Sequence, residues 1–281
     1  MARPHIEFVP AQFLPWQRGL YEDVRPGVET RVLSRDFDTG AASLMLRYPA
    51  GFARPEREHL SADEEFFVLD GIIEINGQRY DRHCYGFYPA GYVRYGVYSG
   101  AGAVVLTFFS REPRARSGIP IFGPDPARVV RCLDTRRMVP SDTHRASMFP
   151  GIKPSGTVHK RLKTDPATDE VTWLVLIRGG WAMTQNEIHP CVEEEFTIAG
   201  EMVGPHGTMR PGAYFWRPPG IEHGPFASAT GTIHFIRGLG GRYTTKLREV
   251  APSPWNVPYD PILPPDYRQH VAGYRDLETC Y

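Results

Sequence analysis

The sequence has 281 residues, of which 32 are lysine or arginine and 32 are aspartate or glutamate, so the formal net charge is zero. The lack of any long block of like charges argues against a nucleic-acid partner, and the lack of a run of about 18 apolar residues argues against a membrane span. The four cysteines form no C-x-x-C pair and the first residues lack a signal-peptide core. We therefore expect a cytoplasmic protein with reduced thiols.

Short apolar runs bounded by Gly, Pro, Asn or Asp recur along the whole chain and predict β-strands. The 27 prolines and 28 glycines make turns frequent, so the predicted fold class is all-β. In chain order the runs lie at 42–48, 65–71, 71–75 and 102–109, and then at 171–177, 194–200 and 231–238.

The two series of strands follow the same order and indicate an internal repeat. A shift of about 129 residues superposes Pro89, Gly91 and Arg94 on Pro218, Gly220 and His223, and carries other turn and polar residues with them. The same shift carries Glu64 to Glu193, Gly71 to Gly200, Gly51 to Gly180 and Phe52 to Trp181. We expect one local slip, in which His59 corresponds to His189 at a shift of one residue more. The chain is therefore predicted to contain two copies of one β domain.

Two motifs in the second copy bring chemistry-bearing residues together. The segment "GAYFWRPPGIEH" fits G-x5-P-x-G-x2-H and ends in His223, while an upstream segment reads Glu187-x-His189-x3-Glu193-x6-Gly200. These motifs resemble the two signature motifs of the cupin superfamily. With the repeat, the resemblance covers about residues 30–110 and 158–240.

The resemblance implies a bicupin, two tandem jelly-roll (double-stranded β-helix) barrels related by the repeat. Glu187 stands where the family usually has its first histidine, which leaves open whether this residue binds a metal or moves protons. The expected organisation is an N-terminal arm (1–29), a first barrel (30–112), a linker (113–155), a second barrel (156–241) and a tail rich in proline and aromatic residues (242–281).

Strand geometry gives the motif spacing a physical meaning. Residues i and i+2 of a strand project to one face, so Glu187 and His189 can point into the same barrel. Glu193 follows after a turn, and the Pro-Gly turn directs His223 to the same point. Two histidines and a carboxylate suit non-haem Fe(II) and leave coordination positions open. We expect one divalent metal, with Fe(II) favoured and Mn, Zn or Ni as alternatives.

The first copy is expected to have lost its metal site. Its corresponding residues read Arg57, His59, Glu64 and Arg94, so arginine replaces the histidine that the Pro-Gly turn delivers. A guanidinium stays protonated and has no lone pair for a cation. Arg94 is expected to pair with Glu64 or, alternatively, to bind a carboxylate ligand.

Alternation along the strand before Glu187 predicts a pocket wall of Trp181, Met183 and Gln185, which could equally be plain core. His234 is a further pocket candidate. Strand register leaves open which way other nearby side chains face, namely His206, Tyr214, Trp216 and Arg217.

The sequence favours a non-haem Fe(II) dioxygenase acting on a small carbonyl or aromatic compound, with Glu187 and Glu193 as catalytic residues. One alternative is a hydrolase, lyase or isomerase that uses Mn, Zn or Ni as a Lewis acid, and another is a binding protein without catalysis. The expected partners are a small-molecule substrate and, since antiparallel sheets often pair at their edges, a second copy in a homodimer.

Overall fold

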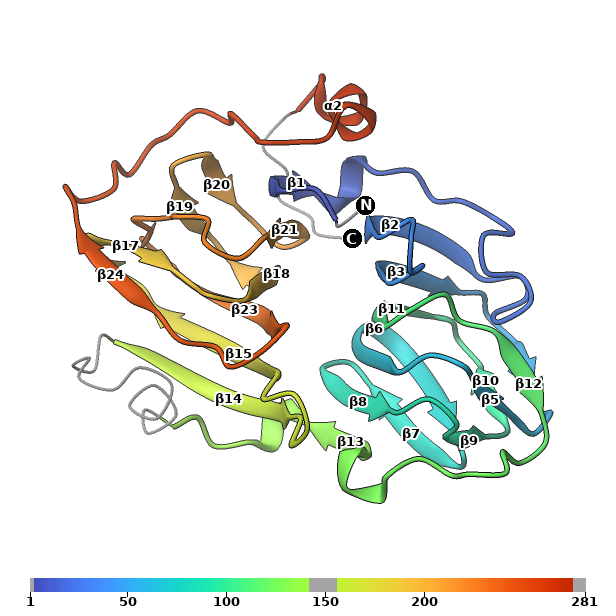
Figure 1. Cartoon of the computed structure of the whole chain (residues 1–281). Helices are drawn as coiled ribbons and strands as arrows, with labels where there is room; N and C mark the ends of the chain where they lie inside the picture. Colours follow the sequence, from blue (N-terminus) through green and yellow to red (C-terminus); the bar gives the residue numbers. More distant parts are fainter. Residues whose placement is uncertain (1–2, 142–155, 275–281) are drawn as a thin grey trace. The chain divides into compact units, whose positions relative to one another are not determined.

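The computed structural model describes residues 3–141 and 156–274, and most of its ordered elements are antiparallel strands (Figure 1). Two compact units divide the chain. The first contains Arg3 and residues 15–138, and the second contains residues 4–14 and the described residues after 138. The expected all-β fold with two related domains is confirmed.

The main sheet of the first unit has the strand order β13-β8-β6-β11-β3-β2. These strands are β2 (Glu29–Arg35), β3 (Ala42–Tyr48), β6 (Glu64–Ile75), β8 (Cys84–Tyr88), β11 (Ala103–Phe109) and β13 (Val130–Asp134). Shorter elements complete the unit: β4 (Phe52–Arg54), β5 (Glu58–Leu60), β7 (Gln78–Asp81), β9 (Val93–Arg94), β10 (Val97–Ser99), β12 (Ala115–Ser117), and the 3-10 turns η2 (Pro126–Arg128) and η3 (Thr135–Arg137).

The main sheet of the second unit has the order β1-β21-β18-β23-β15-β14. These strands are β1 (Ile6–Pro10), β14 (Thr157–Thr164), β15 (Val171–Arg178), β18 (Val192–Gly200), β21 (Ala213–Arg217) and β23 (Gly231–Leu239). Its shorter elements are η1 (Ala11–Phe13), β16 (Trp181–Ala182), β17 (Gln185–Ile188), β19 (Met202–Gly204), β20 (Gly207–Met209), β22 (Ala227–Ser228), β24 (Lys246–Glu249) and the helix α2 (Pro265–Val271).

The two sheet orders are the same when each strand of one unit is replaced by its counterpart in the other. Gly71 and Gly200, one repeat apart, show how closely the backbones agree. Both have positive φ, +73° and +72°, and a Cβ at either position would lie about 2 Å from the carbonyl oxygen of Gly102 or Gly231. A side chain is therefore excluded at both positions, which explains why the repeat keeps glycine there.

Two edge strands lie where the sequence predicted an arm and a linker. β1 pairs with β21 of the second unit, with Ile6 opposite Trp216, although it precedes the first repeat. β13 pairs with β8 of the first unit, with Asp134 opposite Cys84, although it precedes the second repeat. Both strands are visible in Figure 1, where blue β1 adjoins β21 and green β13 adjoins β8. Apolar patterning predicts that a strand forms but not which sheet edge receives it.

Residues 242–274, the described part of the expected tail, are also built into the second unit. β24 pairs with β17, with Leu247 opposite Glu187, and Glu7 and Ile262 form an isolated bridge. The Tyr259 ring packs edge-on against Phe8, with the ring centroids 5.1 Å apart. In the described part of the chain, no helix is long and apolar enough to cross a membrane.

The interior of each unit is filled by the inward-facing side chains of its strands. In the first unit a large cluster of buried residues includes Leu44, Leu46, Phe66 and Tyr88. The second unit has smaller clusters, one around Met202 and Phe215 and another around Trp173, Tyr243 and Ile236. Between these smaller clusters lies the cavity that contains the candidate site.

Candidate metal centre

Backbone pairing brings the two sequence motifs of the second unit together. Glu187 in β17 and His223 form an isolated bridge, and the N–H of Gly220, in the Pro-Gly turn, donates to the carbonyl of His189 at 2.8 Å. Potential ligand atoms of Glu187, His189 and His223 consequently lie within 4.8 Å of one another. The structure thus assembles three of the four expected metal-binding residues in one cluster.

Both histidines present a ring nitrogen that can serve as a metal ligand. Nδ1 of His189 lies 3.0 Å from the carbonyl oxygen of Thr244, and Nδ1 of His223 lies 3.0 Å from that of Ile221. A carbonyl can only accept, so each Nδ1 donates this hydrogen bond, and each Nε2 is the ring nitrogen that faces the site and can offer a lone pair to a cation. Such contacts to the second ring nitrogen are typical of metal-binding histidines.

Glu193, the fourth expected residue, reaches the same point. Its Oε2 lies 3.1 Å from Nε2 of His223, and its Oε1 lies 3.6 Å from Nε2 of His189. Nε2 of His223 is buried without a well-aligned hydrogen bond. The Glu193 oxygen and the His223 nitrogen are therefore separated by roughly the 3 Å expected for neighbouring ligands of one ion. These donors fit a divalent cation.

Two further side chains hold Glu193, whose carboxylate is almost fully buried. Arg217 donates from a terminal guanidinium nitrogen to Oε2 at 2.6 Å, and the Tyr243 hydroxyl donates to Oε1 at 2.5 Å. Burial alone would raise the pKa of Glu193, but His223, His189 and Arg217 hold it well below its usual range. Glu193 is therefore ionised and fixed in orientation.

Tyr243 was not predicted from the sequence because it lies beyond both motifs. Its hydroxyl oxygen is 2.9 Å from Nε2 of His189 as well as bonded to Glu193, and its ring stacks on the His189 imidazole. Burial and the nearby Glu193 and Glu187 carboxylates raise the pKa of Tyr243 well above its ordinary value. The phenol therefore keeps its proton.

Arg217, whose direction the sequence left open, points into the second unit and contacts Glu7 of β1. Its Nε donates to Glu7 Oε2 at 2.6 Å, and a terminal nitrogen pairs with the other oxygen. Burial would lower the pKa of Arg217, but Glu7 and Glu193 raise it above its ordinary value. Burial likewise opposes ionisation of Glu7, yet Arg217 lowers its pKa to about 2. Glu7 lies outside both repeats and had no sequence signal.

The structure of the first unit differs in part from the degenerate metal site that the sequence predicted. Glu64 and Arg94 form a buried ion pair, as predicted, but Arg57 is exposed with its guanidinium over the Tyr95 ring, and His59 points toward the Gly118 carbonyl. The inward residue of β5 is Glu58, which is opposite Arg94 in the β5–β9 ladder. The assumed one-residue slip does not occur, because a shift of one residue turns every side chain of a strand to the other face.

The buried charges differ between the two units. In the first unit Glu58 and Glu64 are matched by Arg94 and by Arg25, which donates to both oxygens of Glu64 at 2.7 and 3.0 Å. Around the histidines of the second unit, the single guanidinium of Arg217 pairs with both Glu7 and Glu193, while Glu187 lies within 4.8 Å of the histidine ligand atoms. With all three carboxylates ionised, Glu7, Glu187, Glu193 and Arg217 would together carry two net negative charges, which one divalent cation would offset.

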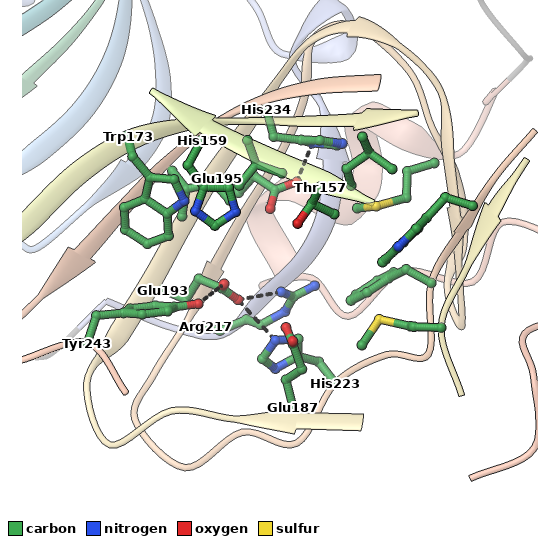
Figure 2. A pocket seen from close by; sticks show the side chains of 17 residues that line it. Thr157, His159, Trp173, Glu187, Glu193, Glu195, Arg217, His223, His234 and Tyr243 are labelled. Atoms are coloured by element: carbon green, nitrogen blue, oxygen red, sulfur yellow. Dashed lines mark hydrogen bonds and ion pairs between the residues drawn. The ribbon is translucent and has the colours of Figure 1, made fainter. Parts of the chain in front are cut away.

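The cavity beside these residues has a volume of about 90 Å³, room for several water molecules or a small organic molecule. Figure 2 shows Glu193, Arg217, His223, Glu187 and Tyr243 along one side, and Trp173, His159, Glu195, His234 and Thr157 along the other. His234 faces Glu195, with Nδ1 and Oε1 2.5 Å apart.

Three of the four predicted pocket residues line this cavity: Trp181, Met183 and His234. Gln185 does not line it, because its side chain turns to the Glu249 carboxylate on the neighbouring strand β24, at 2.5 Å. The sequence could not predict this contact, since β24 lies in the expected tail.

Several proteins of known structure have a similar fold. A protein from Nostoc punctiforme described as a proposed dioxygenase matches with a TM-score of 0.74 and 19% identity, covering 89% of this chain and 92% of that one. Salicylate 1,2-dioxygenase from Pseudaminobacter salicylatoxidans matches with a TM-score of 0.54 and 14% identity, over 74% and 75% of the two chains. A variant of Bacillus subtilis oxalate decarboxylase matches with a TM-score of 0.53 and 12% identity, over 85% and 78%. These likenesses establish the fold.

No curated protein matches the sequence. The sequence profile of the ChrR cupin-like domain matches two segments, residues 9–111 and 137–240, which together span most of the chain. The two segments contain the two repeats. The chain therefore belongs to the ChrR cupin-like domain family and is a bicupin of the cupin superfamily.

Proposed function

We propose that the protein is a metal-dependent enzyme whose second unit binds one divalent cation. His189 and His223 would bind it through Nε2, with carboxylate ligation from Glu187 and Glu193. The observation that carries this proposal is that donor groups of Glu187, His189, Glu193 and His223 converge beside one cavity. In the first unit the corresponding glutamates are instead paired with arginines.

The proposed reaction is oxidation of a small carbonyl or aromatic compound by dioxygen, with Fe(II) as the metal. When bound, Fe(II) would supply adjacent positions for a chelating substrate and dioxygen. The Tyr243 hydroxyl lines the same cavity and donates to Glu193, so it would exchange that hydrogen bond in order to donate to a negative oxygen of the substrate. The apolar side chains of the cavity wall exclude water from the reacting groups, and they include Trp181, Met183, Phe226 and Ile236.

The charges around the cavity support an uncharged or singly charged substrate. Arg217 lines the cavity, but its guanidinium is already engaged by Glu7 and Glu193. One divalent cation would bring the group of Glu7, Glu187, Glu193 and Arg217 to neutrality, leaving little excess positive charge to attract a dianion. A dicarbonyl, hydroxyketone or monoanionic aromatic acid fits this site better than a dicarboxylate such as oxalate.

The direct test is oxygen consumption. Protein reconstituted with Fe(II) is mixed with small dicarbonyls, hydroxyketones, salicylate and oxalate in an oxygen electrode, with His223→Ala as the control. We expect oxygen uptake with a substrate of the first three classes, none with oxalate, and none in the control. Turnover of a substrate without oxygen uptake would overturn the dioxygenase proposal.

A second candidate is Lewis-acid catalysis with Mn, Zn or Ni, in which Glu187 moves protons. The position of Glu187 favours it, because this carboxylate lines the cavity, is only partly buried and makes no side-chain hydrogen bond within the described residues. Turnover without oxygen uptake that is strongly reduced in His223→Ala and abolished in Glu187→Gln would identify this chemistry. A third candidate, a binding protein without catalysis, predicts substoichiometric metal and unchanged ligand binding in His223→Ala.

A further inference from the structure

Glu7 precedes the first repeat, yet its side chain lies inside the second unit. β1 is held on one side by β21, with Ile6 opposite Trp216, and on the other by the Glu7–Ile262 bridge, in which the Glu7 N–H donates at 2.8 Å. The Glu7 carboxylate is almost fully buried and faces Arg217, the last residue of β21. The backbone pairing of β1 does not itself require a buried carboxylate at this position.

Arg217 carries the contact from Glu7 to Glu193. One edge of its guanidinium pairs with both oxygens of Glu7, and the remaining terminal nitrogen donates to Glu193 at 2.6 Å. The guanidinium carbon lies 3.5 Å from the centre of the Phe215 ring, which fixes the plane of the group. The three side chains form one continuous buried chain, Glu7-Arg217-Glu193, that ends at a candidate metal ligand.

We infer that Glu7 is a positioning residue of the metal centre, acting through Arg217 to fix the orientation of Glu193 and to offset the guanidinium charge. This inference rests on the metal-dependent function proposed above. Without the negative charge of Glu7, the positive charge of Arg217 would be directed at Glu193 alone, where it competes with a bound cation. Loss of such an outer partner typically weakens metal binding by about 10- to 100-fold.

Metal affinity measured without turnover tests this role. The full chain is titrated with Co(II) and with Zn(II), and the Co(II) absorption spectrum reports the ligand set. We expect Glu7→Gln to raise the Kd at least about tenfold and to alter the Co(II) spectrum. In an Arg217→Met background the same Glu7→Gln change is expected to alter the Kd less than about threefold, because the residue through which Glu7 acts is gone.

Glu58→Gln is the matched control. Glu58 is also a buried carboxylate paired with arginine, but it lies in the first unit. It is expected to lower the Tm while leaving the Kd unchanged. An equal rise of Kd in Glu58→Gln and Glu7→Gln would overturn the inference, because the effect would then be one of general stability. Wild-type affinity in Glu7→Gln would overturn it as well.

Titration of the wild-type chain tests the proposed metal centre separately from the role of Glu7. Failure of the wild-type chain to bind Co(II) or Zn(II) at one ion per chain would remove the metal centre itself. If Glu7→Gln does not fold, Glu7→Asp replaces it, because aspartate keeps the charge but is too short for the same two contacts with Arg217. We then expect a Kd raised at least about threefold, and an unchanged Kd would reject the positioning role.

Discussion

Leu60 occupies in the first unit the place that His189 occupies in the second. Its carbonyl oxygen accepts the N–H of Gly91 at 2.9 Å, as that of His189 accepts the N–H of Gly220 at 2.8 Å. The pairing of Glu58 with Arg94 likewise corresponds to that of Glu187 with His223. The first unit thus keeps the backbone of the candidate metal centre but carries a leucine and an arginine where the second carries its two imidazoles.

Metal content is expected to be near one ion per chain. His189→Leu, which installs the residue found in the first unit, should abolish it because an alkyl side chain offers no lone pair. Leu60→His should not add a second ion, since Arg94 remains beside it. Elemental analysis of purified variants measures this, and two ions per wild-type chain would contradict the prediction.

Arg94→Met is expected to destabilise the first unit without loss of metal. The change leaves the buried Glu64 with Arg25 alone, and breaking a buried ion pair by removing one partner costs about 3–5 kcal/mol. Denaturant unfolding gives the change in free energy, and elemental analysis gives the metal. A variant as stable as the wild type would show that Arg94 does not support the first unit.

Tyr243→Phe is expected to impair catalysis. The ring remains against His189, while Glu193 loses the hydroxyl that donates to it. A buried acceptor left without its donor costs about 1–3 kcal/mol of stability. Loss of a donor to a ligand weakens metal binding, so activity is measured at saturating metal, where we expect kcat to fall about tenfold or more. Wild-type kcat in this variant would exclude a catalytic part for the phenol.

The Glu7–Arg217 pair should make stability depend on acid pH. The pKa of Glu7 is lowered from 4.5 to about 2 in the folded chain, so the pair stabilises the fold above pH 4.5 and loses this effect as the pH falls toward 2. The whole shift, to which His5 and His223 also contribute, corresponds to about 3 kcal/mol. The stability gap between wild type and Glu7→Gln, measured by denaturation of metal-free protein, should narrow from pH 5 to pH 2. A gap independent of pH would refute this assignment.

The fold and the central residues of the site could be predicted from the sequence because both depend on turn residues at fixed spacings. Gly71 and Gly200 mark equivalent backbone positions that reject a side chain, and the Pro-x-Gly turn before His223 fixes where that histidine is delivered. Such constraints are local, so they appear as fixed spacings in the chain. Because the chain contains two repeats, most of these spacings occur twice.

Two kinds of error have physical causes. Matching His59 with His189 by residue type introduced a slip that strand alternation forbids, and the uniform shift would have given Glu58 and Leu60. Glu7, Arg217 and Tyr243 were missed or left open because each reaches the site through pairing between strands far apart in sequence. No periodicity within a strand records the partner of that strand.

The placement of β1 has a consequence for how the protein is made. Glu7 and Arg217 are 210 residues apart, and β1 is synthesised long before β21, the strand that it must join. During translation β1 therefore leaves the ribosome long before the strand with which it pairs. Contacts between residues this far apart in sequence slow folding. We therefore expect the second unit to complete its refolding only after the N-terminal segment has paired with it.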